Sequence, residues 1–512
     1  DANRQQPQLA FGDFAFEPVH DRGIAGVVVA DFDADGWDDM YVTNGPGRAN
    51  SLFMNRRGRG FTDVAQRGGS ALIAQDSSGA CAGDVDNDGR VDLYVLGKNS
   101  ANRLLRNLGH GRFADITDPG VTAAGTRSHN SCTMGDFNGD GRLDIAIANS
   151  FDLHNALPII AVPYALNQRN QLLQNVDGRR FTDVSDSSGF AHIEVDPKDV
   201  PPDQGQAPLA DISWSVSAID IDQNGTQDLV VANDQAAVPM RKYGGVNRGL
   251  LRVYRNNGKG RFTDVTQQVG TNHPGAWMGL AFGDFNFDGT VDIFSGNGGD
   301  YMFLPLPEMG IKTGDLSSRW FLQRKDGTFA DPRDSSLADP VKQGADPTLG
   351  GIGANPWAWG SSAFDYNNDG YTDIFYHGSM DGMTWVTADN PGALLRNNGP
   401  RAMRKGLYPS FSFDPSFARS GKDQRKRTVT GVAVGDFTHS GFSDIVSVAQ
   451  SIKQGALTPY SSERPFDFDS PFDEDASFLK TYERIGGGPA VPSILLRPTG
   501  AKTTDGDLSV AR

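Results

Sequence analysis

Residues 31–39 read DFDADGWDD, and the same nine-residue pattern recurs six more times along the chain. The later copies are DVDNDGRVD from Asp84, DFNGDGRLD from Asp136, DIDQNGTQD from Asp220, DFNFDGTVD from Asp284, DYNNDGYTD from Asp365 and DFTHSGFSD from Asp436. From these first residues, successive copies begin 53, 52, 84, 64, 81 and 71 residues apart. A constant unit separated by insertions of varying length is typical of a repeat architecture.

Each repeat contains the same succession of β-rich segments. An apolar run such as residues 26–30 (GVVVA) precedes the loop, and a run such as residues 92–95 (DLYV) follows it. An Asn-x-Leu-x-x-Asn segment and a Phe-x-Asp-Val segment come next, joined by glycine-containing sequences that favour hairpins. Seven repeats of four strands, without helical periodicity, predict an all-β fold, a seven-bladed β-propeller of four-stranded antiparallel blades.

The ends of the chain suggest how the ring closes. The last repeat lacks a Phe-x-Asp-Val segment, whereas residues 9–16 (LAFGDFAF) contain a similar one at the N-terminus. We therefore expect the N-terminal segment to supply a strand to the last blade, which removes an exposed sheet edge. Residues 1–512 then form a single propeller domain. Its long insertions cover about residues 151–170, 190–212, 300–318, 331–356, 376–393, 400–428 and 451–490.

The nine-residue loops place oxygen ligands where one hard cation could be bound. In the first loop, positions one, three, five and nine are aspartates, and Gly36 permits a sharp turn. The backbone carbonyl at position seven would complete the set. Calcium takes about six to eight oxygen ligands and tolerates irregular geometry. No sulfur or imidazole recurs in the pattern, so zinc and copper are poor candidates.

The predicted calcium ligands occupy positions one, three, five, seven (by its carbonyl) and nine of six loops. They are Asp31, Asp33, Asp35, Trp37 and Asp39; Asp84, Asp86, Asp88, Arg90 and Asp92; Asp136, Asn138, Asp140, Arg142 and Asp144; Asp220, Asp222, Asn224, Thr226 and Asp228; Asp284, Asn286, Asp288, Thr290 and Asp292; and Asp365, Asn367, Asp369, Tyr371 and Asp373. In the seventh loop Thr438 and Ser440 replace acids or amides, so we expect about six calcium ions per chain.

An EF-hand and an Asx-rich turn are the two other structures that such aspartate-rich loops suggest. An EF-hand needs a glutamate at position twelve and flanking helices, but Val42, Val95 and Ile147 occupy this position in the first three loops. Asx-rich turns without metal are the simpler alternative. Three or four carboxylates in one turn would repel each other strongly without a cation, which favours the metal site.

The amino-acid composition of the chain argues against two classes of partner, nucleic acids and the membrane interior. The formal net charge of −16 argues against a nucleic-acid surface, which needs clustered lysine and arginine. No apolar run reaches the roughly 18 residues that a membrane-spanning helix needs. The polar start at Asp1 is expected to be a mature N-terminus after processing.

The repeated loops and the two segments that follow them resemble the FG-GAP or VCBS repeat of integrin-α-type propellers. They are most similar to secreted bacterial and animal proteins of the cartilage acidic protein type. This resemblance implies a seven-bladed propeller, calcium in the blade loops and an extracellular, cell-surface or periplasmic location. Many such relatives carry a further C-terminal ASPIC/UnbV module, and none is evident in this sequence.

The sequence indicates function less directly. No G-x-S-x-G, Walker A or Rossmann motif occurs, and no acid/base or nucleophile constellation stands out. We therefore predict a non-catalytic extracellular scaffold for binding, adhesion or assembly, with a protein or glycan ligand or self-assembly through the insertions. The alternative is a sugar-active lyase or dehydratase with its site at the channel or the insertions. Trp214, Trp277 and Trp359 precede motif aspartates by six or seven residues, and either pack between blades or form a carbohydrate-stacking platform.

The two cysteines, Cys81 and Cys132, both precede a loop, in the second and third repeats. Alternation along the strands lets them either face each other or point apart. An oxidising compartment favours a disulfide between blades, and the alternative is two buried thiols that pack as small apolar side chains.

Overall fold

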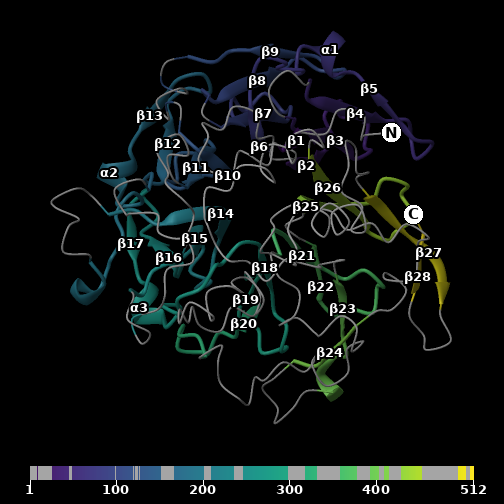
Figure 1. Ribbon diagram of the computed structural model, residues 1–512. Helices are drawn as coiled ribbons and strands as arrows, with labels where there is room; N and C mark the ends of the chain where they lie inside the picture. The colour runs from purple at the N-terminus through teal and green to yellow at the C-terminus, as the bar shows by residue number, and fades with distance from the viewer. Residues whose placement is uncertain are drawn as a thin grey trace, which may run out of the picture.

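The computed structural model describes residues 8–9, 26–44, 49–98, 100–118, 120, 125, 127–150, 167–200, 209–235, 241, 246–297, 318–330, 358–377, 393–402, 409–413, 428–452, 494–502 and 508–511. These residues form an all-β propeller whose sheets surround a central axis (Figure 1). Among them, no helix has the length and apolar character needed to span a bilayer.

Six sheets have the strand order of a propeller blade, with the first strand innermost. Blade one consists of β2 (Val27–Ala30), β3 (Asp39–Val42), β4 (Ser51–Asn55) and β5 (Phe61–Asp63). Blade two consists of β6 (Ser77–Gly83), β7 (Asp92–Gly97), β8 (Arg103–Asn107) and β9 (Phe113–Asp115). Blade three consists of β10 (His129–Gly135), β11 (Asp144–Asn149), β12 (Gln171–Asn175) and β13 (Phe181–Asp183).

The second half of the ring continues this order. Blade four consists of β14 (Ile212–Ile219), β15 (Asp228–Asp234), β16 (Leu251–Asn256) and β17 (Phe262–Asp264). Blade five consists of β18 (Leu280–Gly283), β19 (Asp292–Ser295) and β20 (Arg319–Phe321). Blade six consists of β21 (Gly360–Phe364), β22 (Asp373–His377), β23 (Ala393–Asn397) and β24 (Phe411–Phe413).

A further sheet, here called the last sheet, differs from the blades. It contains β25 (Thr428–Gly435), β26 (Asp444–Ile452), β27 (Ile494–Lys502) and β28 (Leu508–Ala511). The two-residue strand β1 (Gln8–Leu9) pairs with β26 in parallel, which makes this sheet five-stranded. Strand β25 packs against the innermost strands on both sides, β21 and β2.

The blade prediction therefore needs correction. Six sheets, not seven, have the predicted blade order in the described part of the chain, and blade five replaces its fourth strand by a single bridge between Gln323 and Phe329. Residues 10–16 of the expected closing strand lie outside the described residues. The pairing of Gln8 and Leu9 is parallel, whereas a closing blade strand would be antiparallel, so ring closure by the N-terminus stays a prediction.

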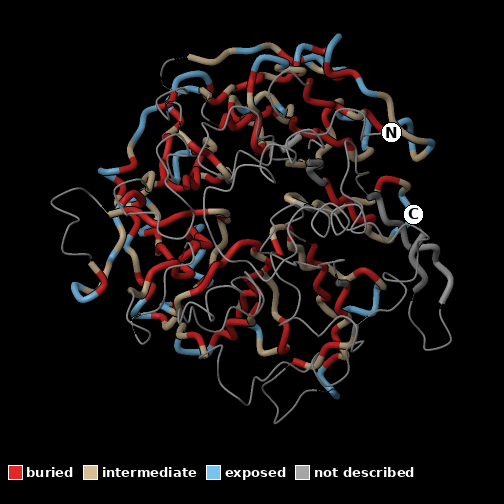
Figure 2. The backbone as a smooth tube through the Cα atoms, in the orientation of Figure 1, coloured by how far each residue is buried: buried red, intermediate tan, exposed pale blue. Residues whose placement is uncertain are grey.

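Burial explains why the second strands are almost entirely apolar. Strands β7 and β11 are buried along their whole length, because each blade is covered on both faces by its neighbours (Figure 2). Apolar clusters fill the spaces between blades, as between blades one and two, where Tyr41 and Leu52 pack with Leu93 and Val95. The exposed residues lie mostly at the outer turns.

Short helices follow some outer strands. Helices α1 (Ala65–Gly68), α2 (Ser185–Ser188) and α3 (Thr266–Val269) each end at a glycine in the left-handed conformation. Single 3₁₀ turns span Pro197–Asp199 and Pro400–Ala402. The first turn belongs to the predicted insertion 190–212, and Arg241 pairs with Asp196 and Asp199 to hold it. Most residues of the other insertions lie outside the described part of the chain.

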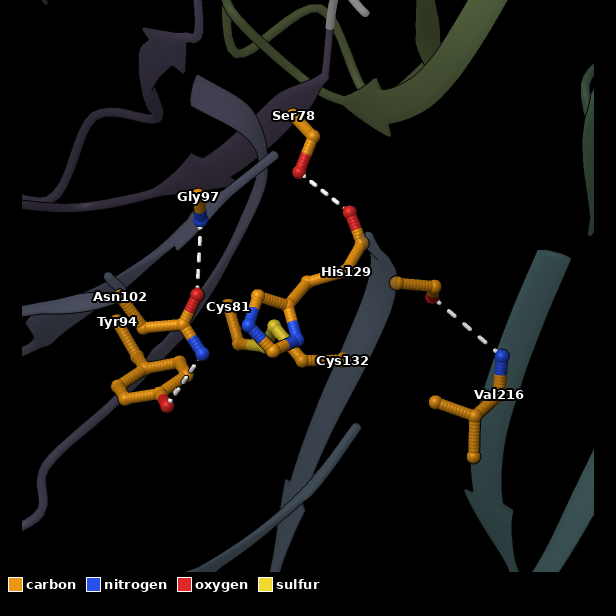
Figure 3. The surroundings of a disulfide bond; sticks show 9 residues. Ser78, Cys81, Tyr94, Gly97, Asn102, His129, Cys132 and Val216 are labelled. Carbon is orange, nitrogen blue, oxygen red and sulfur yellow. Dashed lines mark hydrogen bonds between the residues drawn. A yellow bond between two sulfur atoms is a disulfide. The ribbon is translucent and has the colours of Figure 1, made fainter. Parts of the chain in front are cut away.

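A disulfide joins blades two and three. Cys81 of β6 and Cys132 of β10 are bonded, with their Cα atoms 5.9 Å apart (Figure 3). Sheets that stack face to face are about 10 Å apart, but innermost strands converge on the axis and approach to disulfide distance. The predicted cross-blade disulfide is thus confirmed.

An amide side chain at or just after the end of the third strand, asparagine in five blades and glutamine in blade five, ties each blade to the preceding sheet. The Asn107 amide donates to the carbonyl of Phe32 in blade one (2.9 Å) and to that of Val91 in its own loop (2.8 Å). The equivalent bonds run from Asn175 to Val85, from Asn256 to Phe137, from Gln323 to Ile221, from Asn397 to Phe285 and from Asn55 to Phe437 of the last sheet. We call this repeated bond the blade clasp.

The last sheet has a proline at the register position of the clasp residue. Leu496 pairs with Ile445 in the same register as Leu395 with Ile374 in blade six. Pro498 therefore occupies the register position of Asn397, and a proline side chain has no hydrogen-bond donor.

The clasp predicts unequal effects for two neighbouring asparagines. Asn256→Ala removes a buried amide that donates to the carbonyls of Phe137 and Gln227, although the Phe137 carbonyl keeps the N–H of Gly260. We expect it to lower the free energy of unfolding by roughly 1–3 kcal/mol. Asn257→Ala removes an exposed side chain that bonds only the local turn, and serves as the control. Thermal and denaturant unfolding measure both variants, and equal effects would contradict the role of the clasp.

Candidate metal centres

The seven loops join the innermost strand of each sheet to the second, and their first aspartate shapes the turn. Asp31 Oδ1 accepts a hydrogen bond from the N–H of Asp35 (3.1 Å) and Oδ2 from that of Gly36 (2.8 Å). The same pair of bonds is made by Asp84, Asp136, Asp220, Asp284, Asp365 and Asp436. Gly36 has a φ of 86°, which requires the freedom of glycine.

In three loops the carboxylates at positions one, three and nine converge. Within the described residues, the groups Asp31, Asp33, Asp39; Asp84, Asp86, Asp92; and Asp220, Asp222, Asp228 each bring one oxygen per residue within 4.8 Å of the others. The Oδ1 atoms of Asp33, Asp86 and Asp222 are buried without a hydrogen-bond partner. Burial and the neighbouring Asp35 and Asp31 carboxylates raise the pKa of Asp33. These loops fit a hard cation, which would satisfy the orphaned oxygens.

The position-nine aspartate has a second role that the sequence did not predict. Asp39 accepts hydrogen bonds from the N–H of Phe32 in its loop (2.9 Å) and of Asn55 at the end of the third strand (2.7 Å). The equivalent aspartates of the other blades make the same bond to the end of the third strand: Asp92, Asp144, Asp228, Asp292 and Asp373. This residue therefore fixes the loop to the blade and positions the clasp residue.

The position-nine carboxyls carry the largest shifts in the loops. Burial raises the pKa of Asp39 and Asp144 to about 7, of Asp92 and Asp228 to about 6, and of Asp292 and Asp373 to about 8. Backbone hydrogen bonds oppose the shift, and other loop carboxylates add to it. A bound cation would favour the charged form of these groups.

Positions five and seven are not part of the converging groups. The position-five side chains accept a hydrogen bond from the position-seven N–H, as in Asp35 with Trp37 (3.1 Å). The same bond pairs Asp88 with Arg90, Asp140 with Arg142, Asn224 with Thr226, Asp288 with Thr290, and Asp369 with Tyr371. In the loops with asparagine at position three, Asn138, Asn286 and Asn367 accept from the position-five N–H.

Arginines on the third strand distinguish otherwise similar loops. Arg106 Nε lies 2.6 Å from Asp86 Oδ2, and Arg255 Nε lies 2.8 Å from Asp222 Oδ2. The register position of Arg106 is occupied in blade one by Met54, which leaves Asp33 without such a partner. Arg106 and Arg255 each directly precede the clasp asparagine of their blade. This position is a sequence signal from which the two arginines could have been predicted.

The seventh loop keeps the turn but not the ligands. Asp436 makes both turn bonds and Asp444 accepts from the N–H of Phe437, yet positions three and five are Thr438 and Ser440. His439 of this loop stacks on Trp37 of the first loop, with ring centres 3.7 Å apart.

A protein-family model described as the FG-GAP-like repeat matches residues 31–95, 84–147 and 220–295, three segments that each run from the start of one of these loops to just beyond the next. The chain carries FG-GAP-like repeats. It is also homologous to cartilage acidic protein 1, with 26% identity to the Mus musculus protein over 319 residues and 27% to the Homo sapiens protein over 326 residues. The matches cover 58% of this FG-GAP-repeat chain and 44% and 43% of those relatives, so the chain spans less than half of their length.

Among solved structures, an Agrocybe aegerita lectin that recognises non-reducing terminal N-acetylglucosamine superposes with a TM-score of 0.41 and 16% sequence identity. The superposition covers 76% of this chain and 80% of the lectin. A similarity this low has no bearing on the function of the FG-GAP repeats described here.

The raised pKa values predict how pH affects the metal-free protein. Between about pH 4 and pH 8 the folded state holds protons on the position-nine carboxyls that the unfolded chain releases, so stability falls as the pH rises. Hydrogen bonds lower the pKa of Asp177, Asp196 and Asp326, so these carboxyls change the stability only below this pH window. We expect the calcium-stripped protein to melt at a lower temperature at pH 8 than at pH 5.5. A higher melting temperature at pH 8 would contradict this assignment.

Proposed function

We propose that this chain is a calcium-binding β-propeller that acts as a non-catalytic extracellular scaffold for binding, adhesion or assembly. The observation that carries the calcium proposal is the convergence of three carboxylates in loops one, two and four, with a buried and unpartnered oxygen at position three. The FG-GAP-like repeats and the homology to cartilage acidic protein 1 support it.

In this proposal the last sheet closes the ring of six blades within one domain, residues 1–512. Its inner strand β25 packs between β21 and β2, and Asn55 of blade one donates to the carbonyl of Phe437 as in every other clasp. The ring would close through these contacts, with the N-terminal segment as the additional strand.

Six loops would each bind one calcium ion through the thirty ligands predicted from the sequence. Positions one, three and nine supply carboxylate or amide oxygens, and small movements of positions five and seven would complete the coordination. The seventh loop would stay empty, because hydroxyl side chains are weaker ligands than carboxylates for a hard cation.

The extracellular or periplasmic location rests on the disulfide and the similarity to the relatives. A disulfide between innermost strands persists in an oxidising compartment. In that setting calcium is abundant, and loops with modest affinity would be filled. The partner would be a protein, a glycan or another copy of the chain.

Removal of the metal tests the calcium proposal directly. Excess EGTA should lower the melting temperature of the full chain strongly, because it removes binding energy from the folded state and leaves the clustered carboxylates uncompensated. Calcium should restore the melting temperature, and equimolar magnesium should not. An unchanged melting curve in EGTA would contradict the proposal, as would metal analysis with fewer than about four ions per chain.

The arginines allow a finer prediction. Arg106→Met removes the cation paired with Asp86 and reproduces the methionine of blade one, so we expect calcium to bind loop two about fivefold more tightly. Arg103→Met is the matched control, since Arg103 lies on the same strand but is 3.6 Å from Asp115 and away from the loop. Calorimetric titration measures both variants, and equal affinities would show that Arg106 does not compete with the metal.

A further inference from the structure

One register position recurs on the innermost strands, at the end opposite the metal loops. Strands β6, β10, β14 and β25 each contain a bulge there, and the extra residue is Ser78, Asn130, Trp214 or Thr430, respectively. In blade six this position is Trp359, because Gly360 pairs with His377 in the register in which Ser215 pairs with Ala232. Bulges redirect side chains and are frequent next to functional sites.

The small polar residues at this position bond to the next blade. Ser78 Oγ donates to the carbonyl of His129 (2.6 Å), as Figure 3 shows, and Asn130 Nδ2 donates to that of Ser213 (2.9 Å). Trp214 does not follow this rule, since its indole N–H donates to Asp234 Oδ2 in its own blade (3.1 Å). A residue that departs from the structural pattern of its repeats is a candidate for a function.

The rings of Trp214 and Trp359 meet although they belong to blades four and six. Their centres are 5.0 Å apart and their planes are at 87°, and both side chains are partly exposed. The third tryptophan of the sequence pattern, Trp277, is buried and packs edge-on against Phe321. Packing between blades therefore explains Trp277. The partly exposed pair formed by Trp214 and Trp359, here called the tryptophan corner, needs another explanation.

Blade five lies between these two blades and is shaped to let them approach. A Cβ atom on Gly279, just before β18, would lie 2.5 Å from Ser361 Oγ, 2.7 Å from the Ala358 carbonyl oxygen and 2.9 Å from that of Trp359. Ser215 Oγ also donates across to the carbonyl of Met278 (2.6 Å). A glycine at 279 is thus required for the chain before β21 to reach over blade five.

Polar groups of three blades surround Trp214. Lys98 Nζ lies 5.9 Å from the centre of the Trp214 ring and donates to Asn130 Oδ1 (3.3 Å). Asp234 accepts from the indole N–H of Trp214. Lys98 and Asp234 are buried, so the corner combines two partly exposed aromatic faces with the partly exposed amide of Asn130.

We propose that Trp214 and Trp359 form the stacking surface of a binding site for a neutral oligosaccharide. The C–H face of a pyranose ring packs on an indole, while the partly exposed Asn130 supplies an amide near the rings. A charged ligand is disfavoured because the two charges nearest Trp214, Lys98 and Asp234, are buried and hydrogen-bonded within the protein. The inference deepens the scaffold proposal by naming a ligand class, and it rests on the propeller, not on the calcium count.

Calorimetry and tryptophan fluorescence of the full chain in calcium test the proposal. The neutral probes are cellotetraose, xylotetraose, maltotetraose and chitotetraose, and the charged probes are choline and polygalacturonate. We expect at least one neutral probe to bind and change the fluorescence, and Trp214→Ala and Trp359→Ala each to weaken binding about tenfold or more. Trp359→Phe keeps an aromatic face and should retain part of the affinity.

Ser78→Ala is the control, since it changes the equivalent bulge of blade two and leaves both tryptophans in place. Melting temperatures of all variants establish that each is folded. Absence of binding by every neutral probe, binding that survives both alanine variants, or tighter binding of choline or polygalacturonate would each overturn the proposal. The EGTA melting curve is independent of these results, so a failure here is distinguishable from a failure of the calcium proposal.

Discussion

The buried position-nine aspartate is the interaction on which the rest of the molecule depends. Its two oxygens accept N–H groups from the start of the loop and from the end of the third strand, as in Asp39 with Phe32 and Asn55. The asparagine held in this way then donates to the carbonyl of the preceding blade. One side chain thus links turn geometry, blade assembly and the candidate metal cluster.

This arrangement makes the stability of the fold depend on the charge of the position-nine carboxyls. A carboxyl as buried as that of Asp292, whose pKa is raised to about 8, is costly to ionise near neutral pH unless a cation lies beside it. The orphaned oxygens of Asp33, Asp86 and Asp222 face the same requirement. A bound divalent cation would lower the cost of ionising the position-nine carboxyl and would coordinate the unpartnered oxygens. The arginines beside Asp86 and Asp222 compensate part of the same negative charge.

The last sheet keeps the position-nine aspartate, Asp444, but departs from the blades in two other respects. Thr438 and Ser440 remove the ligands of its loop, and Pro498 occupies the register position of the clasp. It receives a clasp from blade one, through the carbonyl of Phe437.

Local chemistry in the sequence determined the repeat, the four-stranded blades, the turns of all seven loops and the candidate ligands at positions one, three and nine. Each depends on residues within one loop or one hairpin, such as Asp31 and Gly36. Tertiary structure alone decided which carbonyl each clasp reaches, that Cys81 faces Cys132, and that Trp214 meets Trp359. These partners lie far apart in the chain, and the stacking of blades around the axis, which no local pattern encodes, sets their distance and orientation.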